Sequence, residues 1–254
     1  MKVAPKKHLG QHFLTDPSVC LDMVNAITFE RGAKCIVEIG PGTGALTKYL
    51  LPLEKELHVY EVDSESIAYL LIHFPKTFKI HEKDFLRAKL EEDVSFPAVL
   101  VGNFPYNISS QILFKLYDYK EDFPEMVGMF QKEVAERISS PPGSKKYGIL
   151  SVLLQAFYDI EYLFTILPEK FNPPPKVDSG VIRMVRNDVK QLPIDEGFFK
   201  TVVKAAFNQR RKTLRNSLKG IGEVPEEWSG LRPEQMSVDA FIRLTSALSK
   251  QKSE

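Results

Sequence analysis

Short apolar runs rich in β-branched residues alternate with helix-like stretches through the first two thirds of this chain. The runs lie at 35–39, 57–61, 78–81, 98–101 and 126–130. This alternation predicts an α/β fold with a mostly parallel sheet, because parallel neighbours need a crossover, usually a helix, between them. Two more runs, at 160–167 and 180–185, follow a helical stretch at 149–157 and bring the predicted sheet to seven strands.

The composition and the hydrophobic pattern of the sequence change after Arg186. Residues 187–197 are polar, and the pattern beyond them is helical throughout. We therefore place a boundary here, between an α/β domain at 1–187 and a small all-α domain at 188–254. A length of 254 residues suits one substantial core with an appendage of this size.

Composition excludes several classes of protein. The sequence has no apolar run long enough to span a membrane, and its N-terminus lacks the apolar segment of a signal peptide. Its two cysteines, Cys20 and Cys35, form no CxxC or Cys/His ligand pattern. We expect a soluble cytoplasmic protein with neither a disulfide nor a metal site.

Positive charge is concentrated in two places, although the formal net charge is only +1. Three lysines precede the first acidic residue, Asp16. The segment 199–220 carries seven Lys or Arg residues and no Asp or Glu. Because local charge governs encounter with an anionic partner more than the sum does, both zones are candidate nucleic-acid contacts.

A glycine turn joins the first apolar strand to a helix. Gly40, Gly42 and Gly44 alternate with other residues there, which allows a tight turn and close approach of the backbone to a ligand. The pattern is GxGxG, not the GxGxxG that binds a dinucleotide pyrophosphate at a helix N-terminus. A nucleoside cofactor without phosphate, S-adenosylmethionine, is therefore favoured over NAD.

Three carboxylates follow or precede strand ends near this turn. Glu61 ends the second strand, where a carboxylate can accept hydrogen bonds from ribose hydroxyls. Glu38 precedes the turn, and it either meets the cationic part of the cofactor or serves as a capping or salt-bridging acid. Asp84 follows the third strand, where it can accept from an adenine amino group or simply be solvated.

The segment Asn103-Phe104-Pro105-Tyr106 after the fourth strand is the most specific signal in the chain. Adenine N6 is a poor nucleophile because its lone pair is delocalised into the ring. The side-chain oxygen of Asn103 and the backbone carbonyl of Phe104 could accept from both N6 hydrogens and localise that pair. Pro105 would fix the turn, and Tyr106 would stack on a splayed-out base.

Five ordered blocks of sequence resemble the ribosomal RNA adenine dimethyltransferase family, whose fold is that of the Rossmann-like class I methyltransferases. The resemblance covers nearly the whole chain. The blocks span 9–14, 38–44, 103–107, 171–179 and 207–215.

The resemblance also implies roles for particular residues. His12 and Leu14 would contact the cofactor, with Gly40, Glu61, Asp84 and Asn103 completing its site. The family commonly has asparagine where this chain has His12. Phe171 would be a second aromatic wall opposing Tyr106, unless it is a hydrophobic plug beneath the proline-rich loop.

The family reaction transfers two methyl groups to each of two adjacent adenosines near the 3′ end of small-subunit ribosomal RNA. The resemblance therefore implies a monomeric enzyme whose partner is the small ribosomal subunit. Two rival functions keep the same fold: methylation of large-subunit RNA, and a non-catalytic role in ribosome assembly. Methylation of DNA adenine is a further alternative.

The last basic zone falls within a predicted helix at 201–218. On such a helix the cationic residues would share one side and apolar residues an adjoining one. We expect this side to contact RNA phosphates, which position an enzyme without reading bases. The residues expected to do so are Lys204, Arg210, Arg211, Lys212 and Arg215.

Overall fold

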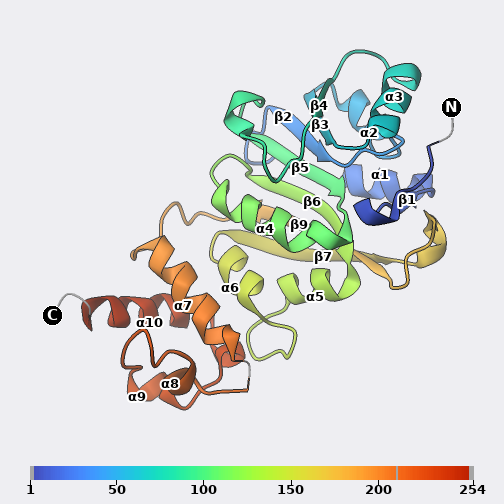
Figure 1. Ribbon diagram of the computed structural model, residues 1–254. Coiled ribbons are helices and arrows are strands. Elements are labelled where there is room, and N and C mark those ends of the chain that lie inside the picture. The colour runs from blue at the N-terminus through green and yellow to red at the C-terminus, as the bar shows by residue number, and fades with distance from the viewer. Residues whose placement is uncertain (1–2, 210, 252–254) are drawn as a thin grey trace. The chain divides into compact units, whose positions relative to one another are not determined.

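A mostly parallel sheet of seven strands runs through the first part of the computed structural model, which describes residues 3–209 and 211–251 (Figure 1). Its strands, in sheet order, are β4 (Lys79–Glu82), β3 (Glu56–Glu61), β2 (Cys35–Ile39), β5 (Ala98–Asn103), β6 (Glu125–Gln131), β9 (Ser179–Arg186) and β7 (Tyr158–Ile166). Neighbours from β4 to β6 pair in parallel, whereas β9 is antiparallel to β6. The α/β prediction is confirmed, with every predicted strand within two residues of its bounds.

Helices connect the strands and cover the sheet. They are α1 (Pro17–Asn25), α2 (Thr47–Leu50), α3 (Ser64–His73), α4 (Ser109–Asp118) and α5 (Lys132–Ser139), with short 3-10 turns at Lys7–Leu9, Leu51–Leu53, Leu90–Glu92, Tyr106–Ile108 and Pro168–Lys170. Asp16 caps α1 and Asp63 caps α3, each accepting from a backbone N–H of the first turn.

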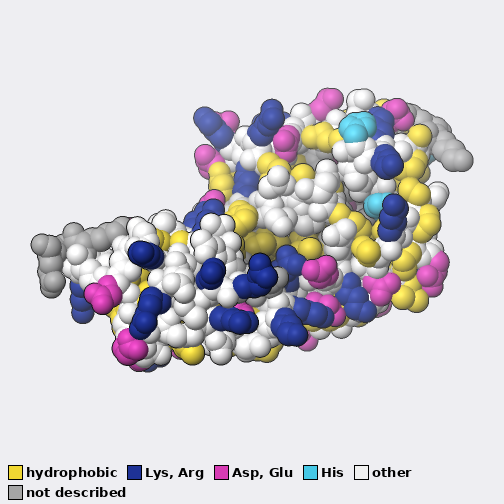
Figure 2. Space-filling model, turned by 60° about the horizontal axis from the view of Figure 1, so that its bottom comes forward, with side chains coloured by type: hydrophobic (Ala, Val, Ile, Leu, Met, Phe, Trp, Pro, Cys, Tyr) yellow, Lys and Arg dark blue, Asp and Glu magenta, His cyan; other side chains and the backbone are white. Residues whose placement is uncertain are grey.

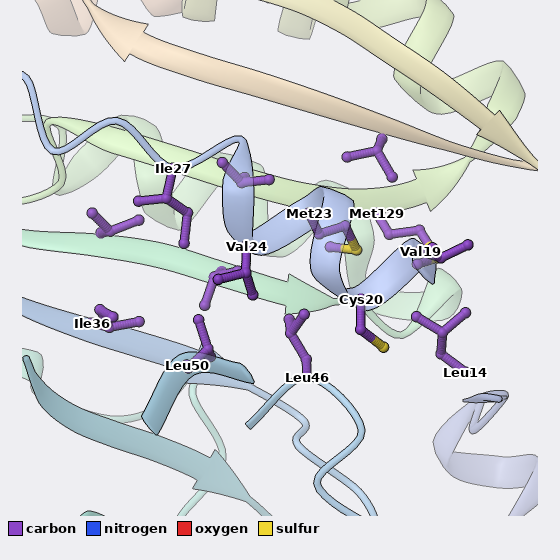
Figure 3. Packing of buried hydrophobic residues seen from close by; sticks show 14 of the residues in the cluster. Leu14, Val19, Cys20, Met23, Val24, Ile27, Ile36, Leu46, Leu50 and Met129 are labelled. Atoms are coloured by element: carbon purple, nitrogen blue, oxygen red, sulfur yellow. The ribbon is translucent and has the colours of Figure 1, made fainter. Parts of the chain in front are cut away.

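The core lies where α1 and α2 meet one face of the sheet (Figure 3). Residues of β2 are buried on both faces, as is usual for a central parallel strand. From α1, Cys20 and Met23 enter this cluster, and Leu50 enters it from α2. Burial of this apolar surface holds the carboxyl ends of the central strands in fixed positions.

A second, two-stranded sheet joins distant parts of the sequence. β1 (Phe13–Leu14) pairs antiparallel with β8 (Phe171–Asn172), so that Leu14 faces Phe171 across the ladder. Strands of two residues carry no periodic signal, and neither strand was predicted. The pairing brings the N-terminal segment to the edge of the main sheet where its functional residues lie.

The chain forms two compact units, and their limits differ from the predicted domains. One unit contains residues 1–135 and 160–186, and the other contains 136–159 and 187–254. The chain passes between the units three times, and the last passage, at 186/187, falls one residue from the predicted boundary. The other two, at 135/136 and 159/160, were not predicted, because 136–159 lies between strands of the α/β pattern.

The second unit is built from helices. They are α6 (Ile149–Gln155), α7 (Glu196–Asn208), α8 (Leu214–Ser217), α9 (Glu226–Ser229) and α10 (Val238–Gln251), with a 3-10 turn at Pro233–Gln235. Phe207 of α7 stacks on Phe241 of α10, with ring centroids 5.8 Å apart, and also meets Tyr147. Tyr147 lies just before α6, and α6 itself contacts α7 and α10, so this helix shares a core with the C-terminal helices.

The predicted helix at 201–218 is wrong beyond Asn208, where α7 ends. Thr213 is extended, and the backbone N–H of Leu214 donates to the carbonyl of Leu231. In a continuous helix that N–H would donate four residues back along the chain. Burial of Leu214 holds the break in place, so the basic residues beyond α7 do not continue its face.

Candidate active site

Two of the three predicted glycines shape a cavity at the carboxyl ends of β2 and β3. All three have positive φ: Gly40 at 64°, Gly42 at 54° and Gly44 at 78°. Gly40 and Gly42 line the cavity, whereas Gly44 does not. A Cβ on Gly44 would lie 2.3 Å from the ring of Phe74, so this glycine permits close packing of the segment after α3.

The cavity encloses about 230 Å³ and gathers most of the predicted site. Its wall is formed by the glycine turn, the ends of four parallel strands and the N-terminal segment around β1. Carboxyl ends of parallel strands are the usual position for a ligand in an open α/β sheet. The predicted residues that line it are His12, Leu14, Glu38, Gly40, Gly42, Glu61, Asp84, Asn103, Phe104, Pro105 and Tyr106.

Glu61 is held by backbone N–H groups. One carboxylate oxygen, Oε1, accepts from Val62 and Asp63, each at 2.9 Å, and Oε2 accepts from Gly42 at 3.1 Å. Burial raises the pKa of Glu61, and these three donors oppose that shift by stabilising the charged form. The carboxylate is thus fixed with lone pairs left to accept from a ligand.

Glu38 is buried with a much poorer set of partners. The hydroxyl of Thr47 donates to its Oε2 at 2.7 Å, and no ion pair to this carboxyl occurs among the described residues. Burial raises the pKa of Glu38 to about 8, with a smaller effect from Glu61 in the same direction; the hydroxyl and the backbone N–H of Thr47 oppose this shift only in part. The salt-bridging alternative for this acid therefore finds no support in the structure.

Asp84 stands at the opposite end of the cavity. Its Oδ1 accepts from the backbone N–H of Leu86 at 2.9 Å, and its Oδ2 lies 3.6 Å from Arg87. Phe85 is buried beside it and lies edge-on to Tyr60, which also lines the cavity. A half-exposed carboxylate next to two rings can accept from a flat heterocycle seated there.

The side-chain amide of Asn103 has a defined orientation. Its Nδ2 donates to the backbone carbonyl of His12 at 2.8 Å. Because a carbonyl oxygen can only accept, the nitrogen must face His12, and Oδ1 remains an acceptor on the other side. Phe104 is buried with its ring beside Gly102 and Gly128, where any Cβ would clash with it.

Tyr106 is held at both its hydroxyl and its ring. The hydroxyl lies 2.5 Å from Oγ of Ser179, and burial raises the pKa of Tyr106. The imidazole of His12 stacks on the phenol ring, with centroids 5.6 Å apart and planes inclined by 27°. Nδ1 of His12 lies 2.8 Å from the carbonyl of Pro173, and because a carbonyl oxygen only accepts, Nδ1 is the donor.

Phe171, the predicted second aromatic wall, is placed elsewhere. It is 4% exposed, belongs to the core cluster around α1 and does not line the cavity. Its position in β8, opposite Leu14, draws the ring inward. The ring that stacks on Tyr106 in this structure is that of His12.

Several residues that hold the N-terminal segment were not predicted. Lys6 forms an ion pair with Asp63, and Gln11 donates to the same carboxylate at 3.1 Å. Together they tie this segment to the end of β3. Ser179 and Thr47 were missed too; Ser179 lies in one of the resemblance blocks, but nothing in its local sequence indicates the contact with Tyr106.

The predicted RNA-binding residues lie in the second unit and are not equivalent. Lys204 is exposed on α7, Arg211 and Lys212 are exposed in the connection to α8, and Arg210 lies outside the described residues. Arg215 pairs with Glu226 at 2.9 Å and also donates to Ser229. Lys and Arg side chains recur across this unit, at the left of Figure 2, with acidic ones between them.

Comparison with known proteins decides the family. Residues 3–239 match the family described as ribosomal RNA adenine dimethylase. The chain belongs to this family. Its cofactor is S-adenosyl-L-methionine, as the glycine turn predicted.

Relatives and solved structures agree with this assignment. The chain is 53% identical to ribosomal RNA small subunit methyltransferase A of Cytophaga hutchinsonii and 52% identical to that of Porphyromonas gingivalis, over 98% of its length in each case. These alignments cover 98% and 99% of the two relatives.

Two solved structures show the fold. One is a dimethyladenosine transferase from Plasmodium falciparum, with a TM-score of 0.81 and 24% identity, covering 95% of this chain and 98% of that one. The other is the 23S rRNA methyltransferase ErmE, with a TM-score of 0.67 and 21% identity, covering 93% and 99%. The class I methyltransferase fold is thereby confirmed.

No helix within the described parts of the chain is long and apolar enough to cross a membrane. Nor do the described residues contain a group of three or more His, Cys, Asp or Glu side chains that could hold a metal ion.

Proposed function

We propose that this protein dimethylates N6 of two adjacent adenosines near the 3′ end of small-subunit ribosomal RNA, as part of small-subunit biogenesis. Its relatives at about half identity bear the name of a small-subunit RNA methyltransferase. The family and the cofactor are those of an N6 dimethyltransferase. The cavity offers acceptor groups suited to both the cofactor and a target adenine.

The observation that best supports the proposal is the amide of Asn103. Its nitrogen is engaged by His12, so its oxygen is available as an acceptor in the same cavity as the glycine turn. Asn103 Oδ1 and the carbonyl of Phe104 would accept from the two N6 hydrogens of adenine. That pair of bonds draws N6 towards tetrahedral geometry and localises its lone pair.

The cofactor supplies the methyl group on a cationic sulfur. No strong general base is required at N6, because the amine loses its proton readily once it has become cationic. Glu61 would accept from the ribose hydroxyls and Asp84 from the adenine amino group of the cofactor. Tyr106, fixed by Ser179, would stack on the target base.

The second methylation meets a different substrate. After the first transfer N6 retains one hydrogen, so only one of the two acceptor bonds survives. The pocket must also accommodate the methyl already present. Tight positioning by stacking on Tyr106 would matter more in this step than in the first.

The two units would have different functions, one in catalysis and one in binding RNA. The sheet-containing unit holds the cofactor cavity, and the helical unit would dock on the folded RNA of the small subunit through Lys204, Arg211 and Lys212. Such contacts position an enzyme without reading sequence. We place the protein in the cytoplasm, as a monomer that recognises the shape of the ribosomal particle.

Methyl transfer to purified particles tests the function. Unmethylated small subunits and large subunits are incubated separately with the protein and radiolabelled S-adenosyl-L-methionine, and the RNA nucleosides are then separated. N6,N6-dimethyladenosine in the small subunits alone is the expected result. Label in the large subunits alone would move the target there, and particle binding without any transfer would favour a non-catalytic assembly role.

A further inference from the structure

Two buried carboxyl groups share the cavity wall but differ in what stabilises their charge. Glu61 accepts from three backbone N–H groups. Glu38 is 1% exposed, and the donors that stabilise its charge come from one residue, Thr47, through its hydroxyl and, more weakly, its backbone N–H. An ionised carboxylate needs several donors or a cation when it is taken out of water. Glu61 has several donors, whereas Glu38 has donors from Thr47 alone and no neighbouring cation among the described residues.

The charges around Glu38 do not make up the difference. The groups that act on it from neighbouring elements are Glu61 at the end of β3 and the thiol of Cys20 on α1, and neither is cationic. Lys48 follows Thr47 on α2, but it forms no ion pair with this carboxyl. Glu38 is therefore short of positive charge on every side that the structure describes.

The order of the strands fixes which part of the cofactor Glu38 faces. From β4 through β3 and β2 to β5, the cavity presents Asp84, Glu61, Glu38 and Asn103 in turn. With adenine at Asp84 and ribose at Glu61, as proposed, the methyl-bearing sulfur would lie towards Asn103, the residue proposed to hold the target nitrogen. Glu38 lies between the ribose position and the transfer position.

We propose that Glu38 recognises the positive charge on the cofactor's sulfur, holding a proton while the cavity lacks that charge and releasing it when the sulfonium binds. The inference rests on the proposed function of the cavity as the cofactor site. The raised pKa of Glu38, about 8, agrees with a carboxyl that is neutral in the free protein near pH 7. A sulfonium beside it supplies the missing cation and lowers that pKa.

With this role for Glu38, the methyl-transfer step itself neither releases nor takes up a net proton. In the transfer, a bond forms between N6 and the methyl carbon, the carbon–sulfur bond breaks, and sulfur keeps the electron pair and becomes neutral. N6 loses one proton, and Glu38, no longer facing a cation, takes one up from the surroundings. The net proton release of each cycle therefore moves to the step in which the next cofactor binds.

This arrangement favours exchange of the spent cofactor. Once sulfur is neutral, the ionised form of Glu38 is unsupported, and its reprotonation removes the attraction that held the sulfonium. Dimethylation of two adenosines needs four transfers, and hence three replacements of the spent cofactor between them. A site that distinguishes the two sulfur states by charge limits inhibition by its own product.

Calorimetric titration of the whole protein with S-adenosylmethionine and with S-adenosylhomocysteine tests the proposal. Titrations at pH 7 in buffers of different ionisation enthalpy give the number of protons released. A pKa of about 8 predicts release of about 0.9 proton with S-adenosylmethionine and little with S-adenosylhomocysteine. The dissociation constant for S-adenosylmethionine should fall close to tenfold per pH unit between pH 6 and 7.

Matched variants assign the proton to its carboxyl. Glu38→Gln keeps the shape and the bond from Thr47, so it should still bind the cofactor while losing the proton release and the pH dependence. Asp84→Asn makes the same chemical change at the other end of the cavity, and it should weaken binding but leave the proton count unchanged.

The results that would overturn the proposal are distinct from failure of the cofactor site. Binding without proton release, equal release with both ligands, or release that persists in Glu38→Gln would each refute the charge-recognition role. Absence of any binding heat and of any affinity for S-adenosylmethionine would instead refute the assignment of the cavity.

Discussion

The amide nitrogen of Asn103 donates to the backbone carbonyl of His12, and the imidazole of the same His12 stacks on Tyr106. One residue of the N-terminal segment therefore contacts two side chains that we propose act on the target base, Asn103 at the end of β5 and Tyr106 just after it. It does so through different atoms, which allows the two contacts to be separated experimentally. Substitution of the His12 side chain leaves the backbone carbonyl that orients Asn103 in place.

Asn103→Ala should lower the rate of methyl transfer by about 10²-fold or more, because it removes the acceptor that localises the N6 lone pair. Cofactor affinity should fall far less, since Gly42, Glu61 and Asp84 keep their positions. Single-turnover transfer to small subunits and calorimetric binding of S-adenosylmethionine measure the two quantities. Unchanged turnover would rule out the role given to this amide.

His12→Ala should lower kcat/KM on small subunits by roughly tenfold, a value within the range expected from loss of one stacking partner. The same change should leave the affinity for S-adenosylmethionine within a few fold. The family's aromatic-wall role for Phe171 makes the opposite prediction, so Phe171→Leu is the comparison. Because Phe171 is a core residue here, that variant should retain transfer and lose about 1 kcal/mol of stability.

The opposite outcome for these two variants would change the interpretation of the site. Full activity in His12→Ala together with loss of transfer in a folded Phe171→Leu would mean that Phe171 turns towards the base when RNA binds. Thermal unfolding of both variants shows which losses of activity reflect lost structure.

Arg211→Ala should weaken binding to small subunits and reduce the slope of log affinity against log salt by about one, as expected for one phosphate contact. Arg215→Ala should change the slope less, because Glu226 already neutralises that guanidinium. Glu226→Gln frees Arg215 and should steepen the slope. Filter binding over a series of salt concentrations would check all three, and equal slopes throughout would show that these residues are only solvated.

A pair of histidines on the neighbouring strands β3 and β4 should make stability depend on pH. Nδ1 of His58, a fully buried side chain, lies 2.9 Å from Nε2 of His81, and burial lowers the pKa of both rings. Their neutral forms are favoured in the fold, so their contribution is present above about pH 6.5 and is lost as pH falls below it towards the folded pKa values.

The variant His81→Gln isolates this effect. The raised pKa of Glu38 has the opposite effect on stability, because the folded state binds the extra proton below about pH 8 and gains stability as pH falls. The effect of Glu38 is the same in wild type and variant, so the difference between the two reports on the histidines. The quantity to compare is the free energy of unfolding in urea at about pH 7.5, 6.5 and 5.5. The variant should lose less stability on acidification, and identical losses would exclude the histidine pair as the cause.

The fold was predictable because its signals are local. Each central strand is buried on both faces and reads as a continuous apolar run, and the glycine turn follows directly in sequence. The carboxylates that line the cavity could be predicted for the same reason, since they lie at or near the ends of those strands. Gly44 does not line the cavity, and its positive φ here serves packing against Phe74, a use that the glycine pattern alone does not distinguish from ligand approach.

What could not be predicted depends on contacts between distant segments. The connection after α7 looks helical by composition, whereas the bond from Leu214 to Leu231 and the burial of Leu214 explain the break. Phe171 lies in a two-residue strand whose partner strand, β1, is more than 150 residues earlier in the sequence. The stacking of His12 on Tyr106 likewise needs the N-terminal segment to cross the end of β5.

The pairing of β1 with β8 has a consequence for synthesis of the protein. A nascent chain that stops short of Asn172 has already made the glycine turn, Glu61, Asp84 and Asn103, but it lacks the strand on which Phe13 and Leu14 close over them. The carbonyl of Pro173, which anchors His12, is also missing. The enzyme that modifies ribosomes thus cannot complete its own catalytic pocket until about two thirds of its chain has been translated.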